Sequence, residues 1–209
     1  MSLLPIFLKL TSRRCVVIGA GNIAAEKIHS LLQSEADVHV IAPQALPELQ
    51  SLAAEKRITW EQRVFEPSDV EGAFLVIAAT STPSVNHHVY QTAVAHNILC
   101  NAVDDPPNCD FYFGSVVRRG DLQVAISTAG ESPALAQRLR REIDEQLPHD
   151  LGPWLGSLGS LRRDVLAAYY PGEDRKMLLH QLAQRDVCDS PSCPSRQLAL
   201  EREQSEVAR

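Results

Sequence analysis

Two adjacent carboxylates, Asp104 and Asp105, come directly after residues 98–103, an apolar segment of strand length. A carboxylate at the end of a buried strand can accept a proton from a substrate that is losing hydrogen. The same side chain can instead cap the turn that leads into Pro106 and Pro107, since aspartate often bonds to the backbone of turns. The residues alone leave both roles open for Asp104, with Asp105 as its neighbouring competitor.

A second chemical feature is the glycine-rich turn Gly19-Ala20-Gly21-Asn22-Ile23-Ala24, which follows the apolar run 15–18. Gly19 permits a turn that a Cβ would block, Gly21 lets the backbone approach a phosphate, and Ala24 permits close packing of helix on strand. The unpaired N–H groups and the positive dipole end of the following helix would face a pyrophosphate. The pattern predicts a nucleotide-binding turn.

The end of the second predicted strand, Ala42-Pro43-Gln44, contains no acidic residue and no arginine. In the simplest NAD-binding pattern an acidic residue here holds the ribose hydroxyls, and an arginine accommodates the extra phosphate of NADP. The residues therefore leave the identity of the nucleotide open. Backbone groups around Ala42 and Pro43 are the expected ribose contacts.

Strand-like and helix-like segments alternate over the first half of the chain, which is typical of an α/β fold with a Rossmann-like doubly wound parallel sheet. Ligands bind at the carboxyl edge of such sheets, where the glycine turn, the end of strand two, Ala79-Thr80 and Asp104 would gather. The predicted strands are 15–18, 37–41, 58–63, 73–79 and 98–103, the predicted helices are 23–34, 47–56 and 85–96, and a turn is expected at 80–84.

After Pro106-Pro107 the pattern changes. Residues 111–117 and 122–127 resemble the two strands of a hairpin, and Ser132 and Pro133 suit the start of a helix that runs to about residue 147. Pro148 and Pro153 are expected to break the chain before helical segments at 154–170 and 175–184. The predicted organisation is a nucleotide-binding domain at 1–113, a small α+β dimerisation and substrate segment at 114–149, a helical C-terminal region at 150–185, and a poorly ordered tail or late helix at 186–209.

The composition is that of a globular protein: 209 residues, 44% hydrophobic, 22% charged, with a net charge of −6. The acidic balance gives no support for binding to nucleic acid or to an anionic membrane. No signal peptide or membrane span is recognisable, so the cytoplasm is the expected location. The five cysteines are dispersed along the chain. The spacing typical of metal ligands is absent from the pair Cys188 and Cys193 and from the adjacent pair His87 and His88. No bound metal is therefore expected.

Five runs together are similar to one family. They are Leu4-Pro5-Ile6-Phe7, the glycine turn, Ile77-Ala78-Ala79-Thr80, Cys100-Asn101-Ala102-Val103-Asp104-Asp105-Pro106, and residues 125–136 with Ser127-Thr128-Ala129-Gly130-Glu131-Ser132-Pro133. The chain resembles the precorrin-2 dehydrogenase/sirohydrochlorin ferrochelatase family of siroheme synthesis, which includes the N-terminal half of bacterial siroheme synthase. The resemblance covers residues 1 to 185, and the last two runs are its most specific part.

The resemblance implies dehydrogenation of precorrin-2 to sirohydrochlorin with NAD⁺, followed by insertion of Fe²⁺ to give siroheme. It also implies a homodimer, and it makes Asp104 the expected base. The expected cofactor contacts are Gly19, Gly21, Asn22, Ile23, Ala42, Pro43, Gln44, Ala79 and Thr80. The expected substrate contacts are Asn101, Thr128, Gly130, Ser132 and Arg138.

Each substrate contact has a simpler alternative. Asn101 can satisfy backbone groups at the end of a strand, and Ser132 with the turn at 128–130 can be an ordinary helix cap. A substrate with many carboxylates calls for arginines, and the candidates Arg118, Arg119, Arg138, Arg140 and Arg141 can equally form a solvated helix or hairpin face.

Two departures from the family stand out: Gly114 replaces a usual proline, and Thr128 replaces a serine that is phosphorylated in one branch, which leaves that regulation doubtful. The competing functions are a dehydrogenase without chelatase activity and, more distantly, an NAD(H)-sensing module without catalysis.

Overall fold

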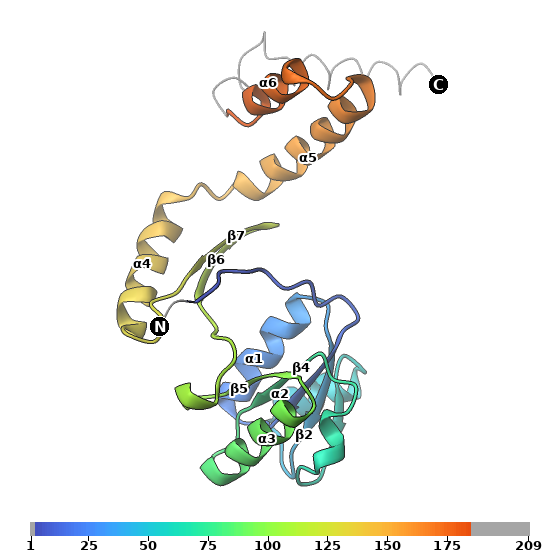
Figure 1. Ribbon diagram of the computed structural model, residues 1–209, viewed down its shortest axis with the longest axis vertical. Coiled ribbons are helices and arrows are strands. Elements are labelled where there is room, and N and C mark those ends of the chain that lie inside the picture. The colour runs from blue at the N-terminus through green and yellow to red at the C-terminus, as the bar shows by residue number, and fades with distance from the viewer. Residues whose placement is uncertain (1–2, 185–209) are drawn as a thin grey trace. The chain divides into compact units, whose positions relative to one another are not determined.

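The computed structural model describes residues 3–184 and divides the chain into two units (Figure 1). The first unit comprises the residues up to Phe113 together with Ala129–Glu131, and the second comprises Gly114–Thr128 and the residues from Ser132 on. The tail expected at 186–209 lies outside the described residues.

The first unit is built on a five-stranded sheet in the order β3-β2-β1-β4-β5. All neighbouring strands are parallel, which confirms the predicted doubly wound fold. The chain leaves β1 toward one edge and returns to the other side of β1 with β4, so the strand order reverses beside β1, where such folds bind ligands. The strands are β1 (Arg14–Ile18), β2 (Asp37–Ile41), β3 (Thr59–Glu61), β4 (Leu75–Ala78) and β5 (Leu99–Ala102).

Both faces of the sheet are covered, because successive side chains of a strand point to opposite faces. Val17 of β1 belongs to a buried cluster with residues of α1 (Asn22–Gln33) and α2 (Pro47–Ala54). Its neighbour Val16 belongs to a second cluster with residues of α3 (Pro83–Ala95) and the 3₁₀ helix η1 (Pro67–Val70). β1 and β4 are buried along nearly their whole length, as expected for central parallel strands.

The element boundaries differ from the predictions at proline residues. Helix α3 begins at Pro83, not at residue 85, because proline is favourable at the first helical position. The predicted turn at 80–84 is therefore shorter than expected. The 3₁₀ helices at Pro67–Val70 and η2 (Pro106–Asn108) were not predicted, and both also begin with proline.

Up to residue 184, the second unit contains a hairpin and three helices. They are β6 (Ser115–Arg119), β7 (Leu122–Ile126), α4 (Pro133–Gln146), α5 (Leu151–Ala168) and α6 (Glu173–Leu182). The antiparallel pairing of β6 and β7 confirms the predicted hairpin, although its first strand begins at Ser115 and not at residue 111.

Two further details of the structure concern Pro153, for which the prediction was wrong, and Gly114, for which the structure explains the residue type. Pro153 was expected to break the chain, but it lies in the first turn of α5, where its missing N–H costs no helical hydrogen bond. At Gly114 a Cβ would lie 2.8 Å from the carbonyl oxygen of Ile126. The position therefore has little room for the proline that is usual in the family. Within residues 3–184 no helix is both long and apolar enough to span a membrane.

Candidate nucleotide site

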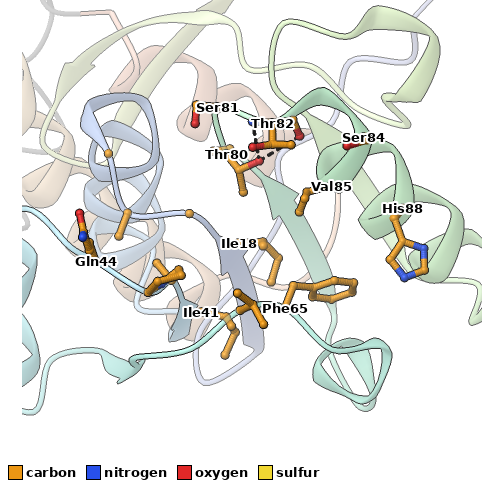
Figure 2. A pocket seen from close by; sticks show the side chains of 17 residues that line it. Ile18, Ile41, Gln44, Phe65, Thr80, Ser81, Thr82, Ser84, Val85 and His88 are labelled. Carbon is orange, nitrogen blue, oxygen red and sulfur yellow. Dashed lines mark hydrogen bonds between the residues drawn. The ribbon is translucent and has the colours of Figure 1, made fainter.

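A cavity of about 630 Å³ lies in the first unit at the carboxyl ends of β1, β2 and β4 (Figure 2). Of the predicted cofactor contacts, seven line it, while Asn22 and Ile23 lie next to it at the start of α1. Its lining residues are Ile18, Gly19, Ala20, Gly21, Ile41, Ala42, Pro43, Gln44, Val64, Phe65, Ala79, Thr80, Ser81, Thr82, Ser84, Val85 and His88.

Gly19 forms the tight part of the turn that enters the cavity. Its φ of +112° lies in a region that favours glycine, and its N–H donates to the Ile41 carbonyl at 2.9 Å. A Cβ at Gly19 would lie 2.7 Å from the carbonyl carbon of Ala79. The glycine therefore allows the ends of β1 and β4 to approach each other closely.

Gly21 has a different role, because nothing lies within 4 Å of a Cβ built there. It is the N-cap of α1, and no side chain caps that helix end. The first N–H groups of α1 are left for another acceptor. Open space beside Gly21 and an uncapped helix N-terminus together fit a pyrophosphate, which needs close backbone approach and N–H donors.

The end of β2 supplies fewer free backbone groups than expected. The N–H of Ala42 donates to the Glu61 carbonyl at 3.2 Å, and its carbonyl accepts from Trp60 Nε1 at 3.0 Å. Pro43 has no N–H to donate. The exposed Gln44 is therefore the residue of this loop with both side-chain and backbone polar groups to offer a ribose.

The opposite wall of the cavity is the loop after β4. The N–H of Ala79 donates to the Ile18 carbonyl at 2.8 Å. Thr80 bonds to the side chain of Asn86 through its N–H, its carbonyl and its hydroxyl. Thr80 thus lines the cavity with its polar groups already engaged within the protein.

At the end of the cavity away from Gln44, Phe65 and His88 lie edge to face with ring centroids 5.8 Å apart (Figure 2). The cavity also has lining residues that were not among the predicted cofactor contacts: Ile18, Ala20, Ile41, Val64, Phe65, Ser81, Thr82, Ser84, Val85 and His88. Apart from His88, which can be protonated, no lining residue carries a charge. The cavity can accept a phosphate without repulsion by a carboxylate.

The segment that carries Phe65 is fixed by an ion-pair network. Arg63 bonds to Glu61 and to Asp69, and Asp69 also accepts from the backbone N–H of Glu66 at 2.8 Å. Burial alone would raise the pKa of Asp69, but the hydrogen bonds from Arg63 and Glu66 and the positive charge of Arg63 lower it overall. A charged Asp69 therefore holds the loop between β3 and η1.

Asp104 lies after β5 on the same edge of the sheet, exposed and with a left-handed φ of +60°. Its carboxylate has no hydrogen bond or ion pair with any of residues 3–184. The neighbouring Asp105 accepts from Asn108 Nδ2 at 2.6 Å and is the N-cap of η2. Of the two carboxylates, Asp105 takes the turn role and Asp104 remains available as a base.

The loop that presents Asp104 is tied back to β5 by several bonds. Asp110 accepts from the Cys100 N–H at 2.9 Å, and the Cys109 thiol donates to the Ala102 carbonyl at 3.1 Å. Asn101, only 6% exposed, donates to the Phe111 carbonyl at 2.7 Å. This matches the simpler alternative for Asn101, in which it satisfies backbone groups at the strand end.

Comparison with known proteins decides the family. Residues 6–115, more than half of the chain, match the family model described as putative NAD(P)-binding, and residues 119–146 match the model described as sirohaem biosynthesis protein central. The chain belongs to this NAD(P)-binding family. The two adjacent matches confirm the resemblance expected from the sequence runs.

The named relatives of this chain are consistent with that family assignment. The chain is 38% identical over 176 residues to siroheme synthase of Pseudoalteromonas translucida and 39% identical over 184 residues to that of Methylobacillus flagellatus. These alignments cover 84% and 88% of this chain, but only 37% and 39% of the relatives. The chain thus spans about two fifths of the siroheme synthases that it matches.

A solved structure titled "SirC, precorrin-2 dehydrogenase" has the same fold. It superposes with a TM-score of 0.81, covering 97% of this chain and all of that one, at 22% sequence identity. The agreement extends over nearly the full length, whereas the NAD(P)-binding model ends at residue 115, two residues into the second unit.

The segment matched to sirohaem biosynthesis proteins contains most of the predicted substrate contacts of this family. The Ser132 hydroxyl accepts from the Leu135 N–H at 3.2 Å, and its own N–H donates to Thr128 Oγ1 at 3.2 Å. Gly130 follows in the turn with a φ of +86°. These bonds are those of a capped helix, and they leave the first N–H groups of α4 incompletely paired.

The arginines of this segment separate into two kinds. Arg119 is only 10% exposed, pairs with Asp144 at 2.8 Å and also donates to the Leu147 carbonyl. It joins the hairpin to α4 and is removed from the substrate candidates. Arg138 is exposed and pairs with Glu142 on its own helix at 3.1 Å, a surface pair that exchanges easily with solvent.

Among residues 3–184 there is no group of three His, Cys, Asp or Glu side chains that could hold a metal ion. Cys188 and Cys193 lie outside this range. Cys15 and Cys100 are fully buried thiols in β1 and β5. The cysteines that the structure describes are packing residues of the sheet and of the Asp104 loop.

Proposed function

We propose that this protein oxidises precorrin-2 to sirohydrochlorin with NAD⁺ as the acceptor. The observation that carries the proposal is the pairing, in one unit, of an uncharged nucleotide cavity with an unpaired carboxylate at Asp104 on the same edge of the sheet. The names of the relatives, siroheme synthase and precorrin-2 dehydrogenase, supply the substrate class.

NAD⁺ fits the lining of the cavity. Gly19, Gly21 and the first turn of α1 would hold the pyrophosphate, and Gln44 would hold a ribose. The apolar side chains around Phe65 suit an adenine ring, and the absence of arginine and lysine from the lining favours NAD⁺ over NADP⁺. When bound, NAD⁺ supplies the two-electron acceptor that takes a hydride from the macrocycle.

The protein's own contribution to the oxidation is a base. Loss of a hydride from one carbon of precorrin-2 must be balanced by loss of a proton from another position, and the Asp104 carboxylate would accept that proton. A freely available carboxylate is suited to this step because it need not break an existing bond. Its left-handed backbone, held by the ties of Asn101, Cys109 and Asp110 to β5 and the following loop, fixes where the carboxylate is presented.

Insertion of Fe²⁺ into sirohydrochlorin is proposed as a second activity of the same site. The supporting observation is the name siroheme synthase, of which this chain matches about two fifths. Metal insertion releases two pyrrole protons, and Asp104 would accept them one at a time, passing the first to water before it accepts the second. In this proposal Fe²⁺ is a substrate.

A homodimer is proposed because the second unit buries few of its apolar side chains. Its buried hydrophobic residues among those described are Val117, Ala136, Val165 and Leu182. Leu135 on α4 remains 39% exposed. The proposed contacts for substrate carboxylates remain Thr128, Gly130, Ser132 and Arg138. The proposed location of the protein is the cytoplasm.

The test is to mix the purified protein with precorrin-2 and NAD⁺ under anaerobic conditions and follow NADH absorbance. Formation of one NADH per sirohydrochlorin is expected. NAD⁺ binding without NADH formation would favour the non-catalytic sensing module. Addition of Fe²⁺ to sirohydrochlorin, followed by the macrocycle's absorption band, separates the bifunctional enzyme from a dehydrogenase alone.

A further inference from the structure

The buried amide of Asn86, on α3, bonds to Thr80 in the wall of the cavity. Asn86 is 6% exposed and lies one turn into the helix. It does not line the cavity, and nothing in its own helix requires an amide there.

All the described bonds of this amide go to Thr80. Asn86 Oδ1 accepts from the Thr80 N–H at 3.1 Å and from the Thr80 hydroxyl at 2.7 Å. Asn86 Nδ2 donates to the Thr80 carbonyl at 3.0 Å. An amide has one acceptor and one donor group side by side, so it can accept from the N–H and donate to the carbonyl of the same residue, and these partners fix which atom is oxygen and which is nitrogen.

This arrangement supports the wall that faces the glycine turn. Thr80 follows Ala79, whose carbonyl lies so close to Gly19 that a Cβ there would clash with it. The Thr80 hydroxyl also accepts from the Thr82 N–H at 3.2 Å, which extends the bonding along the loop to the start of α3. Without the amide, the N–H and carbonyl of Thr80 would lose their partners, and the loop would be free to turn them toward the space that the nucleotide needs.

We propose that Asn86 is a positioning residue for the nucleotide site, acting through Thr80 and making no contact with NAD⁺. This inference rests on the proposed function, because it assumes that NAD⁺ occupies the cavity. It assigns a specificity to the amide: neither an apolar residue nor a carboxylate can replace it. Aspartate would keep the acceptor for the Thr80 N–H but would place an oxygen against the Thr80 carbonyl.

The test compares Asn86→Ala and Asn86→Asp with the wild type by calorimetric titration with NAD⁺, at a temperature well below every variant's unfolding transition. Both substitutions are expected to raise the Kd for NAD⁺ about 10-fold, the effect typical of losing a buried hydrogen-bonding group. In steady-state assays the KM for NAD⁺ should rise equally, while kcat at saturating NAD⁺ and the KM for precorrin-2 stay within about twofold of wild type.

Thr92→Val is the matched control. Thr92 is also buried on α3, and its hydroxyl donates to the His88 carbonyl at 2.8 Å, within the helix. The control should lower the melting temperature without changing the Kd for NAD⁺. Equal changes in Kd for Thr92→Val and Asn86→Ala would show that only helix stability matters, and would overturn the proposal.

Two further outcomes would also overturn it: wild-type affinity in Asn86→Ala, or wild-type affinity in Asn86→Asp, which would show that the amide donor is not needed. If neither Asn86 variant folds, Thr80→Val removes the hydroxyl from the other side of the same contact, and an unchanged Kd there contradicts the proposal. Failure of the wild type itself to bind NAD⁺ is a different result, since it overturns the proposed function and this inference together.

Discussion

The two units of this protein differ in how much of their structure is held by a core. In the first unit, two buried clusters fill both faces of the sheet, and the strand ends that form the cavity extend directly from them. In the second unit, four hydrophobic residues are buried among those described, and much of its organisation comes from Arg119 and the hairpin ladder. The comparison teaches that the proposed nucleotide site is set by packing, whereas the proposed substrate segment depends on a few polar contacts and on exposed apolar faces.

The largest expected effect comes from Asp104→Asn, which tests whether the chemistry belongs to the first unit. The amide keeps the size of the side chain but cannot accept the proton, so kcat for NADH formation should fall by about 10²- to 10⁴-fold. NAD⁺ affinity should stay at the wild-type value, because Asp104 does not line the cavity. Asp105→Asn is the matched control, and an equal loss of kcat in both variants would contradict the assignment.

The next effect contrasts the two glycines of the turn. Gly19→Ala should lower the unfolding free energy by about 2 kcal/mol or more, because Cβ meets the Ala79 carbonyl and the φ is left-handed. Gly21→Ala should leave the melting temperature nearly unchanged, because its Cβ meets nothing, yet it should weaken NAD⁺ binding. Thermal melts with and without NAD⁺ measure both. A large loss of stability in Gly21→Ala would show that its space is not reserved for a ligand.

Arg119→Ala tests the second unit. Removing this 10% exposed side chain leaves the Asp144 carboxylate and the Leu147 carbonyl without their donor, at an expected cost of about 2 kcal/mol. Hydrogen exchange should accelerate in β6, β7 and the end of α4 but not in β1 or β4. Arg138→Ala, which removes an exposed pair, should cost less than about 0.5 kcal/mol. Faster exchange in β1 after Arg119→Ala would mean that the two units do not unfold independently.

The smallest effect is a pH dependence that arises in the first unit. Burial, followed by the charges of Asp110 and Cys109, raises the pKa of Cys100 to about 12. The pKa of this thiol is higher in the folded protein than in the unfolded chain. Its contribution to stability is therefore fully present below the unfolded-state pKa of about 9, and it declines as the pH rises from there toward the folded-state pKa.

Denaturant titrations at about pH 8 and about pH 10 should show stability falling, by at most about 1.4 kcal/mol per pH unit for one thiol. Cys100→Ala should be less stable than wild type near pH 8 but should lose less on going to pH 10. An equal loss in both proteins would place the titrating group elsewhere.

Much of the fold could be predicted from the sequence because the signals are local. The apolar runs of β1 and β4, the helical spacing of α1, and Ser132 with Pro133 before α4 act over a few neighbouring residues. The glycine turn could be interpreted for the same reason, since Gly19 and Gly21 take their roles from the strand before and the helix after. The family resemblance likewise rests on short runs of residues.

The sequence alone therefore determined the parallel sheet and the glycine turn, for which phosphate binding is proposed, and it made Asp104 a candidate base. Only the tertiary structure decided which carboxylate is free, because Asn108 bonds to Asp105 through the fold of η2. It also decided that Arg119 is structural, that Phe65 and His88 close one end of the cavity, and that Asn86 holds Thr80. The physical reason is that hydrogen bonding and burial depend on contacts between residues that are distant in the sequence, and the spacing of residues along the chain does not predict those contacts.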